Sequence, residues 1–266
     1  MIVDSHAHAF PDALAPRALA ALSAGSGGQH HHLDGTISDL RKSLQRNGID
    51  AAVVACIATR PAQFGGILDW CREIAAPDIV PFPSVHPDDP ELLPHLDAIA
   101  AGGFRGIKLH PYYQGFSLTE VRLEPLYQRC SELGLVLLCH TGFDIAYPRE
   151  RFCDPVRIAA VIGRFPRLKF VATHLGAWAD WDEVETHLLG RNVYLDTAFV
   201  YPFLGHDRMR GMLLRHPAEY LLFGSDTPWD DHATVLAQLR GLQLPAAHEA
   251  ALLGGNAARL LGLTRC

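Results

Sequence analysis

Eight short apolar segments are spread along the chain with amphipathic segments between them, and this alternation limits the possible folds more than any other feature. The apolar segments are rich in β-branched residues and are bounded by turn-forming residues, which is typical of strands. They show little strict alternation of polar and apolar residues, as expected for a parallel sheet covered by helices. We predict strands at residues 2–6, 49–58, 79–85, 104–110, 135–140, 169–174, 192–197 and 220–225.

The amphipathic segments between these strands have the spacing of helices that bury one face. Several are followed by glycine, which helix C-termini favour because glycine adopts a left-handed conformation without steric cost. Gly48, Gly102, Gly134 and Gly190 occupy such positions. We predict helices at residues 37–47, 90–101, 120–133, 155–165, 179–189 and 208–215, and a closing helix capped by Asn256.

Eight strands that alternate with helices in 266 residues are typical of a (β/α)8 barrel. A doubly wound open sheet is the alternative, but it would be expected to carry a glycine-rich phosphate loop after its first strand, where this chain has His6-Ala7-His8. We therefore expect an α/β protein with a single (β/α)8 TIM-barrel domain over residues 1–266, in which the barrel can be distorted. Residues 23–34, rich in glycine and histidine, would form a lid or a mobile loop.

Composition excludes several classes of function. The formal net charge of −6 argues against nucleic-acid binding, which requires a basic face. The longest apolar run, residues 51–58, is far shorter than the roughly 20 residues that cross a bilayer. The N-terminal residues lack a basic segment followed by an apolar one, so we expect a cytoplasmic protein. A homodimer is the default expectation for the oligomeric state of such an enzyme.

Histidines and one aspartate follow the predicted strands at the end where barrel enzymes carry their chemistry. His6 and His8 are two residues apart and therefore project from the same side of the first strand. His140, His174 and Asp226 end the fifth, sixth and eighth strands. Imidazoles and a carboxylate are suitable ligands for a divalent metal, with Zn²⁺ preferred and Mn²⁺ second. A barrel that binds no metal and serves as a binding or scaffold protein is an alternative of another class, and it would require this ligand set to be vestigial.

The chain resembles the amidohydrolase superfamily, specifically the amidohydrolase-related (amidohydrolase 2) branch of metal-dependent TIM-barrel hydrolases and decarboxylases. The resemblance rests on Ile-Val-Asp-Ser-His-Ala-His at residues 2–8, Phe-Arg-Gly-Ile-Lys-Leu-His-Pro at 104–111, the two histidines that end strands five and six, Gly-Ser-Asp-Thr-Pro-Trp at 224–229 and the segment 255–260. It implies that His6, His8, His140 and Asp226 bind a metal. It further implies that His174 orients the substrate or binds a second metal.

Lys108 and His110 form a second pair that projects from one side of a strand, the fourth. Members of this family with two metals often use a carboxylated lysine as a bridge, and Lys108 is the candidate. We favour a single metal, with Lys108 and His110 facing the substrate. Tyr112, which follows the strand directly, is expected to line the substrate pocket.

The predicted function is hydrolysis of a C–N or C–O bond in a small molecule, such as an amide, lactone or ester, by a metal-activated water. Asp226 would act as general base, and His174 would donate a hydrogen bond to the developing oxyanion. The alternative is non-oxidative decarboxylation of an unsaturated or aromatic acid, with an arginine holding the carboxylate. Arg60 is the first candidate for that role, and Arg149 and Arg151 are two more.

Overall fold

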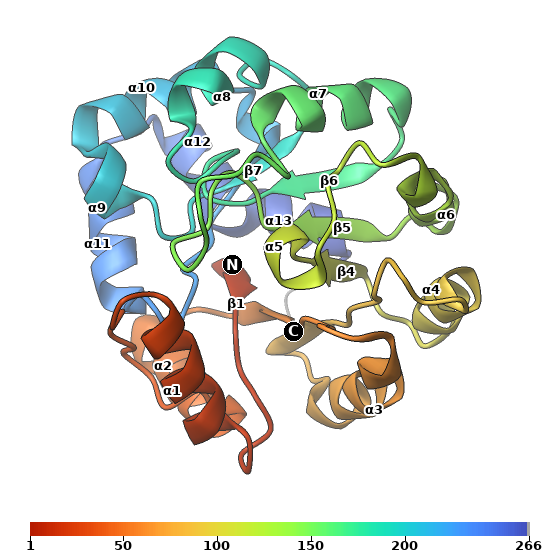
Figure 1. Cartoon of the computed structure of the whole chain (residues 1–266). Coiled ribbons are helices and arrows are strands. Elements are labelled where there is room, and N and C mark those ends of the chain that lie inside the picture. The colour runs from red at the N-terminus through yellow and green to blue at the C-terminus, as the bar shows by residue number, and fades with distance from the viewer. Residues whose placement is uncertain (265–266) are drawn as a thin grey trace.

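A computed structural model describes residues 1–264 of the chain, which contain eight parallel strands (Figure 1). All eight predicted strands are present, most of them shorter than expected. Consecutive strands pair as β1-β2-β3 and as β4-β5-β6-β7-β8. The strands are β1 (Val3–Ala7), β2 (Ala51–Ala55), β3 (Ile79–Phe82), β4 (Gly106–Leu109), β5 (Val136–Cys139), β6 (Lys169–Ala172), β7 (Tyr194–Asp196) and β8 (Leu221–Leu222).

Backbone hydrogen bonds join the two groups of strands into one barrel. The amide of Lys108 in β4 donates to the carbonyl of Pro83 just after β3, at 2.9 Å. On the other side, the amide of Ser5 in β1 donates to the carbonyl of Phe223, and the amide of Asp226 donates to the carbonyl of His6, both at 2.8 Å. The first and last strands therefore meet, and the predicted TIM barrel is confirmed.

The helices surround the barrel, and α13 lies behind the strands in the view of Figure 1. Short 3₁₀ turns, Pro61–Gln63, Val121–Leu123 and Ala218–Tyr220, precede α3, α6 and β8. The helices are α1 (Ala15–Gly25), α2 (Ile37–Asn47), α3 (Phe64–Ile74), α4 (Leu92–Ala101), α5 (Pro111–Gln114), α6 (Glu124–Leu133), α7 (Pro155–Arg164), α8 (Trp181–His187), α9 (Tyr201–Leu204), α10 (His206–Arg215), α11 (His232–Gly241), α12 (Ala246–Ala250) and α13 (Asn256–Leu261).

Two sets of buried side chains form the core, as the two-residue period of a strand requires. On β2, Ala52 and Val54 pack outward against the helices, whereas Val53 and Ala55 pack inside the barrel. The inner set also includes side chains from β3, β5, β6 and β8, and α13 contributes to it as well. The far end of the barrel is therefore filled by side chains, and the histidines lie at the other end, after the strands.

The predicted N-cap role of Asn256 is wrong. The chain is kinked at Gly254, but Gly255 and Asn256 both have helical backbone angles, so Asn256 is the first residue of α13 and not its cap. Its side-chain amide instead donates to the carbonyls of Ala218 and Leu221, at 2.6 and 2.7 Å. Asn256 thus ties α13 to the start of β8.

The segment predicted as irregular at 23–34 is helical up to Gly25, because α1 extends to that residue. No helix within residues 1–264 is long and apolar enough to span a membrane. The assignment of the chain to a single domain stays a prediction, and residues 265–266 lie outside the described part of the chain.

Candidate metal centre

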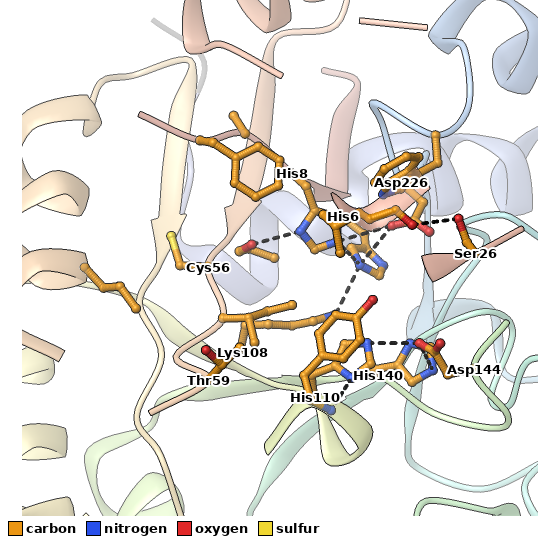
Figure 2. Close-up of a pocket in the computed structure, with 18 of the residues that line it drawn as sticks. His6, His8, Ser26, Cys56, Thr59, Lys108, His110, His140, Asp144 and Asp226 are labelled. Carbon is orange, nitrogen blue, oxygen red and sulfur yellow. Dashed lines mark hydrogen bonds and ion pairs between the residues drawn. The ribbon is translucent and has the colours of Figure 1, made fainter. Parts of the chain in front are cut away.

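A cavity of about 510 Å³ opens at the carboxyl ends of the strands. The close-up in Figure 2 shows polar side chains from strands on opposite sides of the barrel pointing into it. Seven of the predicted site residues line this cavity: His6, His8, Lys108, His110, His140, His174 and Asp226.

The hydrogen bonds of His6 and His8 determine which ring nitrogen of each carries the proton. His6 Nδ1 lies 2.9 Å from Oδ2 of the buried Asp196, and His8 Nδ1 lies 2.9 Å from the carbonyl oxygen of Ala55. Because a carboxylate and a carbonyl only accept hydrogen bonds, both Nδ1 atoms are assigned as donors. The Nε2 atom of each neutral ring therefore carries a lone pair.

These two Nε2 atoms face each other and Asp226, and we call His6, His8 and Asp226 the cation group. The two Nε2 atoms are 3.2 Å apart, and Asp226 Oδ1 lies 3.4 Å from His6 Nε2 and 3.3 Å from His8 Nε2. No proton stands between these three atoms, so their lone pairs repel one another, and Lys108 Nζ approaches His6 Nε2 from the side at 3.1 Å. A tetrahedral zinc site with bonds of about 2.0–2.1 Å has ligand atoms about 3.3 Å apart, so the residues present fit a divalent cation.

Burial keeps this site in the protonation state that metal ligands need. Burial lowers the pKa of His6 well below its usual value, so the ring is neutral at pH 7. Burial alone would raise the pKa of Asp226, but attraction to the neighbouring imidazoles in their protonated forms outweighs it and keeps that pKa well below its ordinary value. Neutral imidazoles and an ionised carboxylate are the forms that bind metal.

Asp196, at the end of β7, organises the site from behind. Its Oδ2 accepts a hydrogen bond from His6 Nδ1, and its Oδ1 accepts from the backbone amides of His174 at 2.8 Å and Ala198 at 3.1 Å.

His174 and Asp226 both have positive φ, at 58° and 63°, a conformation that non-glycine residues rarely adopt. These strained backbones are held by the surrounding hydrogen bonds, as is common at functional sites.

His140 lies beside the cation group, in a second group with His110 and Asp144. The His110 and His140 rings stack 4.1 Å apart, and Asp144 Oδ2 lies 3.4 Å from His110 Nε2 and 3.7 Å from His140 Nε2. The amide of Tyr113 donates to His110 Nδ1 at 3.4 Å, which leaves the proton of His110 on Nε2, facing Asp144. His140 Nε2 lies 3.2 Å from the carbonyl of Phe143 and therefore also carries a proton. Since both Nε2 atoms that face Asp144 are protonated, the second group suits a cation less well than the cation group does.

His174 links the two groups. Its Nδ1 lies 2.9 Å from the carbonyl of Ala198 and is therefore the donor, while its Nε2 lies 3.1 Å from His140 Nδ1. Burial lowers the pKa of His174 to about 4, so at neutral pH its Nε2 carries a lone pair. The facing His140 Nδ1 carries a lone pair as well, because His140 Nε2 donates to the carbonyl of Phe143 at 3.2 Å.

Lys108 is fully buried, and its Nζ lies 3.1 Å from His6 Nε2, the atom that faces the cation group (Figure 2). Burial lowers the pKa of Lys108 from its usual value.

Two predicted substrate-binding residues lie away from the cavity. The Tyr112 hydroxyl donates to the carbonyls of Gly142 and Glu150, and it is the next residue, Tyr113, that lines the cavity. Arg60 is exposed in the loop after β2 and is not among the lining residues. The choice between neighbouring tyrosines depends on the short helix α5, which the strand pattern did not predict.

Sequence reasoning missed Asp144 and the apolar wall of the cavity. Asp144 stands four residues after His140, and this spacing of a carboxylate from a strand-end histidine was the available signal. Burial raises the pKa of Asp144 to about 6. The wall comes from segments after β1 and β2, where no local pattern marks the residues that face inward.

Fold and site together define a class of protein, a TIM barrel whose strand ends gather histidines and a carboxylate around a candidate metal centre. The chain belongs to the amidohydrolase family, whose family model, described as amidohydrolase, matches residues 3–263. Members of this family are enzymes and are typically metal-dependent. No curated protein matches the chain in sequence.

Solved structures share the fold over nearly the whole chain. An uncharacterized TIM-barrel protein from Bordetella bronchiseptica has a TM-score of 0.74 at 20% identity, covering 98% of each chain. The 5-carboxyvanillate decarboxylase LigW from Sphingomonas paucimobilis has a TM-score of 0.73 at 16% identity, covering 99% of each chain. A putative 2-pyrone-4,6-dicarboxylic acid hydrolase from Pseudomonas putida has a TM-score of 0.69 at 21% identity, covering 100% of this chain and 98% of its own. At these identities the likeness shows the fold.

Proposed function

We propose that the protein is a metal-dependent hydrolase that cleaves a C–N or C–O bond of a small molecule, such as an amide, lactone or ester. The observation that supports this most directly is the convergence of three lone pairs, on His6, His8 and Asp226, at the floor of a cavity. A divalent cation bound there, zinc or manganese, would lower the pKa of a water toward ~7 and polarise a carbonyl oxygen.

Asp226 is proposed as the general base. Its carboxylate stays ionised at neutral pH, and it lies in the cavity beside the two imidazoles. It can accept a proton from the attacking water and pass it to the leaving group. The strained backbone at Asp226 fixes the carboxylate in this position.

His140 is proposed as the fourth ligand, because it is buried, its pKa is lowered well below the usual value by burial, and His174 connects it to the cation group. His174 is proposed to orient the substrate. Since its Nδ1–H is given to Ala198, its Nε2 suits accepting a hydrogen bond from the substrate better than donating one to an oxyanion. Lys108 and His110, which line the cavity, are proposed to contact the substrate.

Hydrolysis is favoured over decarboxylation by where the candidate arginines lie. Arg151 forms two hydrogen bonds to Asp180, at 2.7 and 3.0 Å, and Arg149 stacks over Phe143, 3.9 Å from the ring centroid. Neither these two nor the exposed Arg60 lines the cavity. In a decarboxylation, the substrate carboxylate would therefore contact Lys108 and not the guanidinium group of an arginine.

The test combines metal analysis with a substrate panel. Protein purified without chelator or affinity nickel is expected to hold about one equivalent of zinc or manganese and to hydrolyse members of a panel of lactones, esters and amides. Asp226→Asn should abolish hydrolysis while the circular dichroism spectrum is unchanged, and Asp182→Asn, at an exposed position, should retain it. Full hydrolysis by chelator-treated protein, or release of CO₂ from aromatic acids without any hydrolysis, would reject the proposal.

A further inference from the structure

The cavity has a polar floor and an apolar side. The apolar side is formed by the loop after β1 together with α1, and by the loop after β2 together with α3. Figure 1 shows α1 and α3 on either side of the loop after β1. We call these side chains the α1–α3 wall, and they are Phe10, Leu14, Leu22, Ile57, Ile67 and Trp70.

Side chains of this wall remain partly open to solvent. Leu14 is 36% exposed, and Leu22, Ile67 and Trp70 are half-buried. Apolar groups gathered on a concave surface gain free energy when a ligand covers them, roughly in proportion to the apolar area removed from water. The wall is therefore suited to an apolar group of a ligand rather than to protein packing.

Two hydroxyl groups near the wall already have partners within the chain. Ser26 Oγ donates to the carbonyl of Leu22 at 2.9 Å, and Thr59 Oγ1 donates to Gln63 Oε1 at 3.0 Å. Within residues 1–264, Lys108 is the single lysine or arginine among the cavity-lining side chains, and it lies at the floor beside His6. Among the described lining residues, a negatively charged group of a substrate would thus find a cationic side chain at the floor, whereas the side chains along the wall are apolar or, like Gln29 and Gln63, neutral.

We propose that the substrate is an elongated molecule with one polar end, held at the floor beside the cation group, and an apolar body that lies along the α1–α3 wall. This proposal rests on the proposed hydrolase function for the reaction at the polar end. A molecule with a second carboxylate at its far end would have to leave that charge against Leu22, Ile67 or Trp70, where water is displaced and no cation compensates it.

The experiment measures binding apart from turnover. Straight-chain monocarboxylates from butanoate to decanoate, and the dicarboxylates of equal length, are titrated into the metal-loaded protein by calorimetry. We expect the affinity for monocarboxylates to rise about two- to fourfold with each added methylene that reaches the wall. Each long dicarboxylate should bind at least about tenfold more weakly than the matching monocarboxylate.

Two variants place the effect on the wall. Ile67→Asp should flatten the dependence on chain length, and Trp70→Ala should reduce it. Val121→Asp is the matched control, because Val121 is 74% exposed and lies outside the cavity lining, so the dependence should persist. A flat series with the wild-type protein, a preference for dicarboxylates, or an unchanged series with Ile67→Asp would overturn the inference.

The two proposals fail separately. If the chain-length dependence holds but lactones, esters and amides are not hydrolysed, the apolar substrate class stands and the hydrolase function falls. If hydrolysis occurs without any preference for apolar chains, the substrate class falls and the hydrolase function stands.

Discussion

Replacing Asp196 with asparagine should change the proton position on His6 without changing the shape of the site. Asp196 is fully buried, and its Oδ1 accepts from the amides of His174 and Ala198. An asparagine would keep its carbonyl oxygen toward those two amides and turn its NH₂ group toward His6 Nδ1. Since an NH₂ group donates, His6 would carry its proton on Nε2, the atom that faces the cation group.

The expected magnitude follows from the loss of this one orienting bond, 2.9 Å long and buried. Removing the carboxylate partner of a metal-binding histidine typically weakens metal affinity about 10- to 100-fold. At about 1.4 kcal/mol for each factor of ten, the Asp196→Asn variant should bind zinc about 1.4–2.8 kcal/mol less tightly.

Competition with a chromophoric chelator at pH 7.5 measures this difference directly. Asp207→Asn serves as the control, because Asp207 is an exposed carboxylate on α10. Circular dichroism and thermal unfolding of the metal-free proteins confirm that the barrel is intact. If Asp196→Asn binds zinc within about twofold of the wild-type protein, the assignment of the His6 proton, and the cation group built on it, is refuted.

Three further outcomes are expected. His174→Gln should lower kcat about 100-fold or more while metal content stays unchanged, and parallel loss of metal would instead make His174 a ligand. Gly142→Ala should lower the free energy of unfolding by about 3 kcal/mol in urea titrations, because φ is +88° and a Cβ would meet the Trp178 nitrogen at 2.1 Å. Gly163→Ala, in helix α7 with open space around it, is the control and should leave that free energy unchanged or slightly raised. Burial lowers the pKa of His216, so below about pH 6.5 the unfolded state binds a proton that the folded state does not. The free energy of unfolding should therefore decrease as the pH is lowered, and it should decrease less in His216→Gln. Urea titrations at pH 7.5 and 5.0 measure both changes.

The sequence predicts the strand-end residues well because a strand has a simple period. His6 and His8 must share a side of β1, and parallel strands bring their carboxyl ends together, so the meeting of these two with Asp226 could be foreseen. The partner of His6, Asp196, also ends a strand. The positions of His6 and Asp196 follow from counting along a strand, whereas Asp226 lies four residues after β8 with positive φ and is placed by the turn that follows.

Positions after the strands could not be predicted in the same way. Whether Tyr112 or Tyr113 faces the cavity depends on a four-residue helix, and the placement of Arg60 depends on a 3₁₀ turn. His232 shows the same limit, because it begins α11 and is buried with its Nε2 2.9 Å from Asp4, a partner 228 residues away. Such contacts are decided by the packing of distant segments, which leaves no local pattern in the sequence.

The hydrogen bonds between β1 and the residues after β8 form a seam that closes the barrel, and this seam affects when the protein can fold during synthesis. Ribosomes add about 5–20 residues each second, so Asp226 is synthesised about 10–40 s after His6 and His8. Until then a nascent chain offers two imidazoles and no carboxylate to complete the cation group. A metal ion that binds the group afterwards joins the first and last strands, so it would stabilise the finished barrel by binding only the folded chain. Chelation should therefore loosen this seam before the rest of the sheet.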